Sequence, residues 1–239
     1  MRAPWFALSA LVSLVVGCTD DTDPPWQLDH DRIIAVRATP PRIAAGEQAV
    51  LDALIGFHGA PVAVQSPNTA VVDSPASLAG TVTHSGDRWI VTAPGAAQLD
   101  AARTELGLAA GALVPLAVRV GYASGALFAT KTVWLGGDAA NPPMTKVTVD
   151  RADRGDQDDA EIVVAPLVDV PLSIGVDDVD YDVTWLTSCG TMHDFDLPTA
   201  YLKVEVDDPQ SGELVVVLRD AGGGVSWNKW SIHAQGAAQ

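Results

Sequence analysis

Apolar and polar residues alternate along most of this chain, which is the pattern of half-buried β-strands. At 49–55 every second residue, from Ala49 to Ile55, is apolar, and 113–120 also has one wholly apolar face. A run at 33–37 precedes the first of these and is joined to it by a Pro-rich turn. Other runs that predict strands lie at 61–64, 88–92, 126–135, 146–149, 161–164, 171–175, 181–186, 201–206, 213–219 and 225–234. The pattern therefore predicts an all-β fold of short strands joined by turns.

One stretch departs from this alternation and predicts a short helix over 96–106. Leu99, Ala102 and Leu106 recur there at helical spacing. Gly107 follows directly, and glycine is favoured just after the end of a helix because it adopts the left-handed conformation without strain. We expect this helix to pack over one end of a β-sandwich.

A turn-rich stretch near the middle of the chain divides the strands into two groups of similar length. Gly136-Gly137 and Asn141-Pro142-Pro143 are turn signals between the two groups. We therefore expect tandem immunoglobulin-like (Ig-like) β-sandwiches at 33–137 and 146–236, joined by a linker at 138–145.

The first residues form an apolar run that ends at a cysteine. Residues 5–16 are mostly apolar and follow a single basic residue, Arg2. The run is too short to span a bilayer, which takes about 20 apolar residues, so we expect residues 1–17 to be an export signal peptide. The segment 18–32 that follows is rich in aspartate and has no periodicity, which predicts an acidic tether.

The end of the apolar run, Val15-Val16-Gly17-Cys18, resembles the lipobox of bacterial lipoproteins. The resemblance implies that the Cys18 thiol carries a diacylglyceryl group, that the signal is removed before it, and that lipid chains hold the protein to a membrane. Thr19 stands where the retention signal of enteric bacteria has aspartate, which favours the outer membrane. The alternatives are a secretory signal with a chance cysteine, or a soluble protein with a buried first helix.

Charge and cysteine content narrow the function classes further. The chain has 14 basic and 30 acidic side chains, and only Arg2 would be lost with the signal peptide. Such an acidic protein repels nucleic acid and anionic lipid headgroups, so we expect no nucleic-acid partner. Once Cys18 is lipidated, Cys189 is the remaining thiol, and no intramolecular disulfide can form.

Two stretches of the second half carry a further resemblance. The segments 181–191 (YDVTWLTSCGT) and 212–227 (GELVVVLRDAGGGVSW) resemble uncharacterised lipoproteins of myxobacteria, which combine a lipobox with Ig-like domains. They are also similar to PKD-type and other Ig-like modules, although the paired core cysteines of immunoglobulins are absent. The resemblance implies the fold and an envelope location, and it implies no established activity.

Several distinctive residues of the second half fit structural roles. Trp185 shares a strand face with Tyr181 and Val183, so we expect it in the core rather than stacked on a ligand. Strict alternation places Trp227 and Trp230 on opposite faces, so that one is either an exposed contact or packed against a turn.

The glycine-rich stretch before Trp227 does not match a phosphate-binding loop. Such a loop would need a helix after its glycines, whereas here a strand follows. A structural hairpin turn is therefore predicted at Arg219, Asp220, Gly222, Gly223 and Gly224.

The acidic stretch 150–161 is the most suggestive of chemistry. Its carboxylates are of the kind that Ca²⁺ prefers, and their spacing does not match the EF-hand loop. Acidic turns of Ig-like domains bind Ca²⁺ without that motif, and 177–182 would contribute if the two turns meet. The simpler interpretation, which we prefer, is a solvated acidic loop without a cofactor. The candidate ligands are Asp150, Asp153, Asp156, Asp158, Asp159 and Glu161.

No catalytic constellation is evident in the sequence. Cys189 and His193 are four residues apart, but a nucleophile also needs an oxyanion site, and such a cysteine is more often a small buried apolar residue. The histidines show no zinc spacing.

We therefore expect a non-enzymatic binding, adhesion or scaffold protein of the bacterial cell envelope. Its expected partners are the membrane, through the lipid on Cys18, and an envelope protein or glycan. One alternative is a Ca²⁺-dependent adhesion module that uses the acidic stretch. The other is an envelope hydrolase, which requires a cleft holding two carboxyls of raised pKa.

Overall fold

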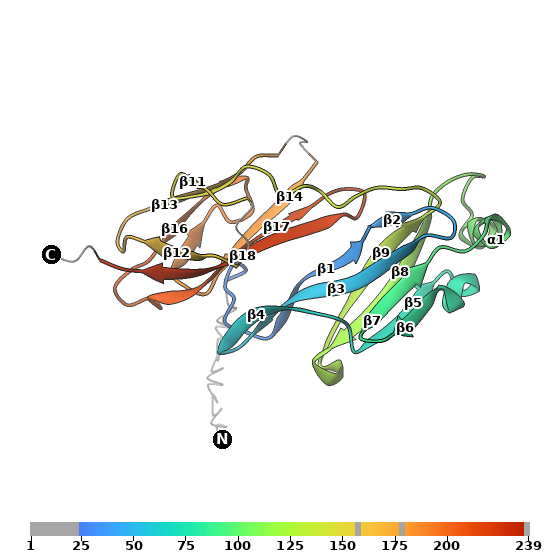
Figure 1. Cartoon of the computed structure of the whole chain (residues 1–239), viewed down its shortest axis with the longest axis horizontal. Coiled ribbons are helices and arrows are strands. Elements are labelled where there is room, and N and C mark those ends of the chain that lie inside the picture. The colour runs from blue at the N-terminus through green and yellow to red at the C-terminus, as the bar shows by residue number, and fades with distance from the viewer. Residues whose placement is uncertain (1–23, 156–158, 177–179, 237–239) are drawn as a thin grey trace, which may run out of the picture.

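The computed structural model describes residues 24–155, 159–176 and 180–236, so the predicted signal peptide and Cys18 lie outside the described residues. Within these ranges the chain forms two β-sandwiches that lie along the long axis of the molecule (Figure 1). The predicted fold class, tandem Ig-like sandwiches with a short helix, is confirmed. No helix in the described part of the chain is long and apolar enough to cross a membrane.

The first domain consists of two sheets packed face to face. The β3 sheet has the order β1-β3-β7-β6, with β4 also paired to β3, and the β8 sheet has the order β2-β9-β8-β5. The elements are β1 (Arg32–Thr39), β2 (Arg42–Ile43), β3 (Gln48–Phe57), β4 (Ala60–Gln65), β5 (Thr69–Ser74), the 3₁₀-helix η1 (Ala76–Thr81), β6 (Val82–Ser85), β7 (Arg88–Thr92), α1 (Ala96–Leu106), β8 (Val114–Tyr122), the 3₁₀-helix η2 (Ala123–Gly125) and β9 (Leu127–Leu135).

The alternation along the strands forms the core of this domain. Every second residue of β3, from Ala49 to Ile55, and of β8, from Val114 to Val120, is fully buried. These two faces meet between the sheets, as apolar faces of a sandwich must in order to leave water.

The predicted helix is present as α1 and covers the far end of the first domain (Figure 1). Its Leu99 and Ala102 are buried in the core. Gly107 ends the helix in the left-handed conformation, with φ of 66°. The turn after the helix therefore uses the conformational freedom of glycine that its position predicted.

The second domain is also a two-sheet sandwich. The β17 sheet has the order β12-β18-β17-β14, and the β13 sheet has the order β11-β10-β13-β16-β15. Its strands are β10 (Val147–Val149), β11 (Ala152–Asp153), β12 (Glu161–Val164), β13 (Val170–Ile174), β14 (Asp182–Thr187), β15 (Thr191–His193), β16 (Thr199–Lys203), β17 (Ser211–Arg219) and β18 (Val225–Ala234).

Five short strands have no counterpart in the sequence analysis: β2, β5, β6, β11 and β15. β2 and β11 have two residues each, too few for a periodic pattern. β6 is an edge strand whose residues are mostly exposed, so little apolar signal marks it. These strands form through pairing with longer neighbours rather than through their own pattern.

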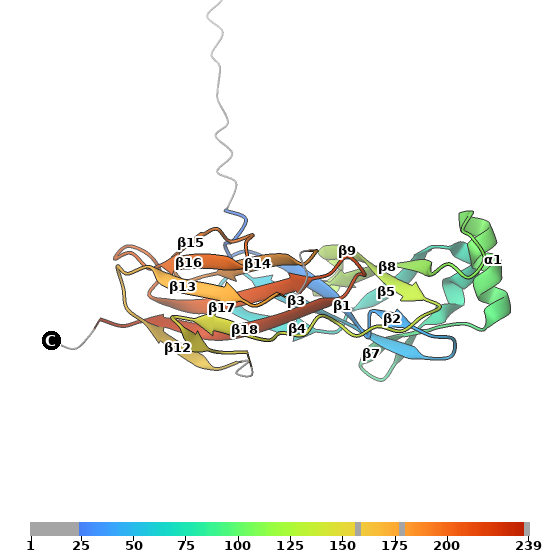
Figure 2. The ribbon, with the colours of Figure 1, turned by 90° about the horizontal axis from the view of Figure 1, so that it is seen from above.

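The described part of the predicted tether, from residue 24 on, is bound rather than free, which corrects the expectation for this part of 18–32; residues 18–23 lie outside the described residues. The Leu28 amide donates to the Thr187 carbonyl (3.0 Å), and the Thr187 amide donates to the Trp26 carbonyl (2.9 Å), so this segment lies along β14. The Trp26 side chain packs against the core of the second domain. In Figures 1 and 2 the first described residues therefore lie near the junction of the domains, before the chain enters β1. So short a segment has no periodicity from which its pairing could be predicted.

Candidate binding site between the two domains

The two domains share a third hydrophobic core, separate from the cores inside the sandwiches. It lies between the outer face of the β3 sheet and the outer face of the β17 sheet. Ten buried apolar residues form it: Leu28, Ile34, Ala35, Leu54, Val62, Leu186, Val215, Val217, Val225 and Trp227. Sheet packing of this kind is typical of a single folded body rather than of two modules on a linker.

The two tryptophans of β18 belong to different cores. Trp230 is 1 % exposed in the core of the second domain, and Trp227 is 6 % exposed in the third core. They do lie on opposite faces, as alternation predicted, but neither is an exposed contact. The Arg37 guanidinium carbon lies 3.8 Å from the centre of the Trp227 ring and its fork binds both carboxylate oxygens of Asp52. The tryptophan is thus covered by a cation of the first domain.

Polar contacts across the junction accompany this core. Asn141 of the predicted linker donates to the Ala38 carbonyl (3.0 Å) and accepts from the Val225 amide (2.9 Å). The Glu213 carboxylate accepts a hydrogen bond from the Val62 amide. The linker is therefore part of the junction, because its side chain satisfies backbone groups of both domains.

The predicted hairpin turn connects β17 to β18 and rests on the first domain. The Asp220 carboxylate accepts from the Gly224 amide (2.7 Å), and the Asp220 carbonyl accepts from the Gly223 amide (3.1 Å). Gly223 has φ of 84°, and a side chain at Gly224 would collide with the Asp220 carboxylate. The Lys131 ammonium of β9 donates to the Gly223 carbonyl (2.5 Å), which ties the turn to the first domain.

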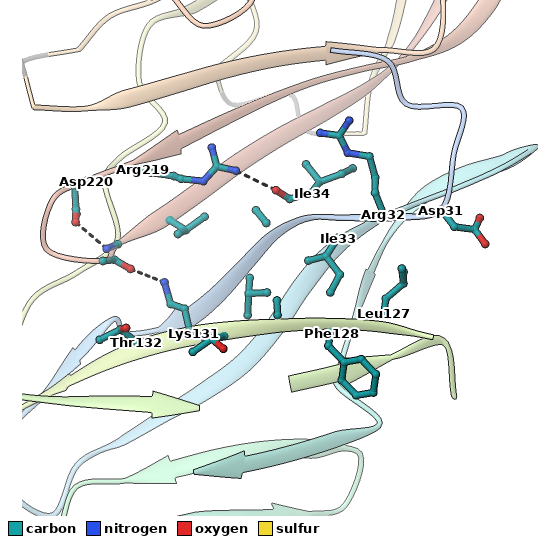
Figure 3. A pocket seen from close by; sticks show the side chains of 17 residues that line it. Asp31, Arg32, Ile33, Ile34, Leu127, Phe128, Lys131, Thr132, Arg219 and Asp220 are labelled. Carbon is teal, nitrogen blue, oxygen red and sulfur yellow. Dashed lines mark hydrogen bonds between the residues drawn. The ribbon is translucent and has the colours of Figure 1, made fainter. Parts of the chain in front are cut away.

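Beside this hairpin lies a groove of about 670 Å³, here named the junction groove. It is bordered by the first half of β1, by β9 and by the hairpin, so both domains line it (Figure 3). Three cations are among its lining residues: Arg32, Lys131 and Arg219. Figure 3 shows Lys131 reaching from β9 to the hairpin and Arg219 reaching to the main chain of Ile34.

Burial shifts the pKa of each of these cations. The Lys131 side chain lies on the inward face of β9, which otherwise carries apolar residues, and the residue is 6 % exposed. Burial lowers the pKa of Lys131 to about 8. Nearby Asp220 opposes this shift. Burial also lowers the pKa of Arg219 and of Arg32, and the charge of Arg219 adds to the effect on Arg32. The low-dielectric junction therefore holds positive charge at a cost.

This group of cations is not predicted from the sequence. A signal for Lys131 was present, because the inward positions of β9 are otherwise Leu127, Ala129, Val133 and Leu135. A lysine at an inward position of an otherwise apolar strand face indicates either that the predicted strand register is wrong or that the lysine belongs to a functional site. No comparable signal marks Arg32 and Arg219, which meet only because the two domains pack together.

A second groove, of about 510 Å³, is also lined by both domains and borders the third core at Leu28. Glu161 and Glu213 line it from strands on either side of β18, both in register with Ser231. Burial raises the pKa of Glu213. The hydrolase hypothesis requires two carboxyl groups of raised pKa in one cleft. Glu213 is one carboxyl group of this kind.

The predicted calcium ligands are only partly within the described residues. Asp156 and Asp158 lie outside them. The Asp153 carboxylate accepts from the Gly155 amide (3.0 Å), Asp159 pairs with Lys229, and Glu161 lines the second groove on β12. Asp150 has a positive φ of 48° in the turn after β10. The residues that the structure describes contain no group of three acidic, histidine or cysteine side chains placed to hold a metal ion.

The remaining candidate residues lie in the second domain. Trp185 is fully buried between the sheets, and its indole N–H donates to the Leu197 carbonyl (3.1 Å). Cys189 is also fully buried, and burial, with a smaller effect of Asp208, raises its pKa to about 11. His193 is exposed on β15. A thiol with so high a pKa is neutral at pH 7 and a poor nucleophile.

Comparison with known proteins adds no family to these observations. The sequence matches no protein-family model and no curated protein. It is similar in structure to the fibronectin(III)-like modules of Clostridium thermocellum CbhA, with 13% identity, a TM-score of 0.30 and coverage of 85% of this chain and 95% of that chain. It is also similar to the two tandem V-type regions of VCBP3, a v-region-containing chitin binding protein, with 12% identity, a TM-score of 0.35 and coverage of 84% and 100%.

A third similar structure is a nucleoside hydrolase-related hypothetical protein from Saccharophagus degradans. The match has 15% identity and a TM-score of 0.32 and covers 41% of this chain. This chain spans 26% of the length of that protein. At such TM-scores none of these structures assigns an activity or a ligand to this chain.

Proposed function

We propose that this chain is a lipid-anchored protein of the bacterial cell envelope whose two Ig-like domains act together as one non-enzymatic binding or scaffold unit. The observation that carries the proposal is the third core, which joins the sandwiches and creates grooves lined by both. A shared core of this kind keeps the two domains in one orientation. The molecule would therefore present a fixed surface to its partners.

The candidate nucleophile supports a non-enzymatic role. Cys189 is fully buried with a raised pKa, and its backbone amide is bonded to the Thr187 hydroxyl (3.0 Å). Such a cysteine contributes to packing rather than to group transfer. The likeness of 181–191 and 212–227 to myxobacterial lipoproteins supports the envelope location.

The path of the N-terminal segment supports anchoring near the middle of the molecule. Residues 26–28 are held on β14 at the junction of the domains. Cys18 precedes Trp26 by eight residues, so a lipid on it would be joined to this point by a short segment. Both ends of the molecule would then remain free for partners.

Anchoring is tested by metabolic labelling of the full chain with palmitate in a Gram-negative host. We expect the wild-type protein to carry label and to sediment with membranes, because Cys18 receives the lipid. Cys18→Ser should lose both properties, and Cys189→Ser is the matched control that should keep them. An unlabelled wild-type protein released into the soluble fraction would contradict the proposal.

A further inference from the structure

The junction groove concentrates positive charge in a strongly acidic protein. The chain has 14 basic and 30 acidic side chains, yet Arg32, Lys131 and Arg219 line one groove. Lys131 is nearly inaccessible in an otherwise apolar row, where a charged group costs stability unless it is compensated. We propose that the junction groove binds a ligand bearing carboxylate or phosphate groups, a ligand class that rests on the binding function proposed above.

The protein contacts hold the two arginines in place without using all of their donors. The Arg219 guanidinium donates to the Thr184 hydroxyl (3.0 Å) and the Ile34 carbonyl (3.0 Å). Arg32 donates from one nitrogen to the carbonyls of Pro25 (3.0 Å) and Gln27 (3.1 Å). A guanidinium has five N–H groups, so each arginine keeps donors for an oxyanion. Such oriented donors bind with little further loss of side-chain entropy.

Most acidic groups near the groove are engaged by other partners, whereas Asp182 forms an ion pair with Arg219 itself (4.0 Å). Asp220 accepts from the hairpin amide of Gly224 (2.7 Å), and Asp52 is bound by both arms of the Arg37 guanidinium. Asp31 accepts from the His58 amide (2.8 Å). The three cations therefore outnumber the carboxylates that line the groove with them, Asp31 and Asp220.

The size of the groove indicates what carries the anionic groups. Its volume of about 670 Å³ is in the range of sites for small organic ligands, which is about 300–1,000 Å³. It follows β1 over Asp31–Val36 and β9 over Leu127–Thr132. A lone inorganic ion would fill a small part of it, so the anionic group belongs to a larger molecule such as an acidic sugar chain or a phosphorylated one.

Anion binding should depend on pH through Lys131. An anion beside it favours the ammonium form, so affinity should fall as the pH rises through the lysine pKa of about 8. The charged groups that act on Lys131 are Asp220 and Arg219 from the hairpin and Asp52 from β3. Arg32 and Asp31 border the same groove. Lys131 is therefore the lining residue whose loss of charge near pH 8 should be seen in the affinity.

The test is isothermal titration calorimetry on the chain lacking residues 1–18, which retains every residue that the structure describes. The probes are trigalacturonate for carboxylates, tripolyphosphate for phosphates and neutral maltotriose as the control ligand. We expect one of the two anions to bind and maltotriose not to bind. Lys131→Met should weaken the binding by about tenfold or more, because a positive charge at the wall of the groove is lost. Arg151→Gln is the matched control, since that arginine side chain is 85% exposed outside the groove.

The wild-type protein gives a second readout that needs no variant. Trigalacturonate keeps its charge between pH 7 and pH 9, so where it is the anion that binds, its affinity should fall at least about threefold over this range. Three outcomes would overturn the inference. Maltotriose could bind as tightly as the anions, Lys131→Met could bind the anion as tightly as wild type, or neither anion could bind at about 10 mM. Each of these failures leaves the palmitate test of the anchored protein unaffected, so the two proposals fail separately.

Discussion

The two sheets of the second domain differ in their outer faces. In β17 the five residues from Leu214 to Leu218 are all buried, because one side faces the domain core and the other faces the first domain. In β13 burial alternates from Val170 to Ile174, and the outer face of that sheet carries exposed residues such as Tyr201. An unbroken apolar run therefore distinguishes a sheet covered on both sides from a sheet that faces water.

This difference shows where the stability of the pair of domains resides. The outer face of the β17 sheet contributes Val215, Val217 and Trp227 to the third core. Apolar burial of this kind contributes about 25 cal/mol for each Å² removed from water. The domains should accordingly unfold as one unit, whereas domains joined only by a linker would unfold independently.

The largest expected effect comes from placing a charge in the third core. Val217→Asp buries a carboxylate between the sheets, which should cost roughly 3–5 kcal/mol and separate the domains. Differential scanning calorimetry should then show two transitions in place of one. Val71→Asp is the control, because Val71 is 52 % exposed, and it should change stability by less than about 0.5 kcal/mol. A single transition at the wild-type temperature in Val217→Asp would contradict the shared core.

Removing the tryptophan of the third core should have the next largest effect. Trp227→Ala leaves a cavity and removes the cation–π contact with Arg37, so we expect a loss of about 3 kcal/mol in urea unfolding. Tyr201→Ala, on the exposed face of the β13 sheet, should lose less than about 1 kcal/mol. Similar losses in the two variants would mean that Trp227 is not part of a packed core.

The buried lysine predicts a pH dependence of stability. Its pKa is lowered in the folded protein from 10.5 to about 8, so between these values the unfolded chain binds more protons and stability rises with pH. The difference corresponds to roughly 3 kcal/mol at most. Lys131→Met should therefore be more stable than wild type at pH 7, and the difference should shrink towards pH 10. Parallel stability curves for the two proteins would contradict burial of the ammonium.

The addition of calcium should have the smallest effect on the stability of the protein. Asp153 and Asp159 already bind Gly155 and Lys229, which favours a solvated acidic loop over a calcium site. We expect millimolar Ca²⁺ and EDTA to give melting temperatures within about 1 °C of each other. A clear rise with Ca²⁺ that is absent from an Asp156→Ala, Asp158→Ala double variant would instead support the calcium-dependent adhesion module.

Local pattern was enough to predict the long strands, the helix and its glycine end. Alternation in β3 and β8 and the spacing of Leu99 and Ala102 report which side of an element is buried. They do not report what covers that side, so alternation predicts opposite faces for Trp227 and Trp230 without showing that one of these faces packs against another domain. The apolar run of β17 carried that information and was interpreted only as a strand. Arg32 and Arg219 could not be brought together from sequence, because their proximity depends on how the domains dock.

The pairing of residues 26–28 with β14 has a consequence for the order of folding. This segment precedes the first domain in the sequence, whereas β14 follows the whole of that domain. The first domain can therefore complete its own core before β14 has been synthesised. The contacts of Trp26 and Leu28 with the second domain form only afterwards, when its strands are present. The first segment of the described chain is thus among the last to take its place in the fold.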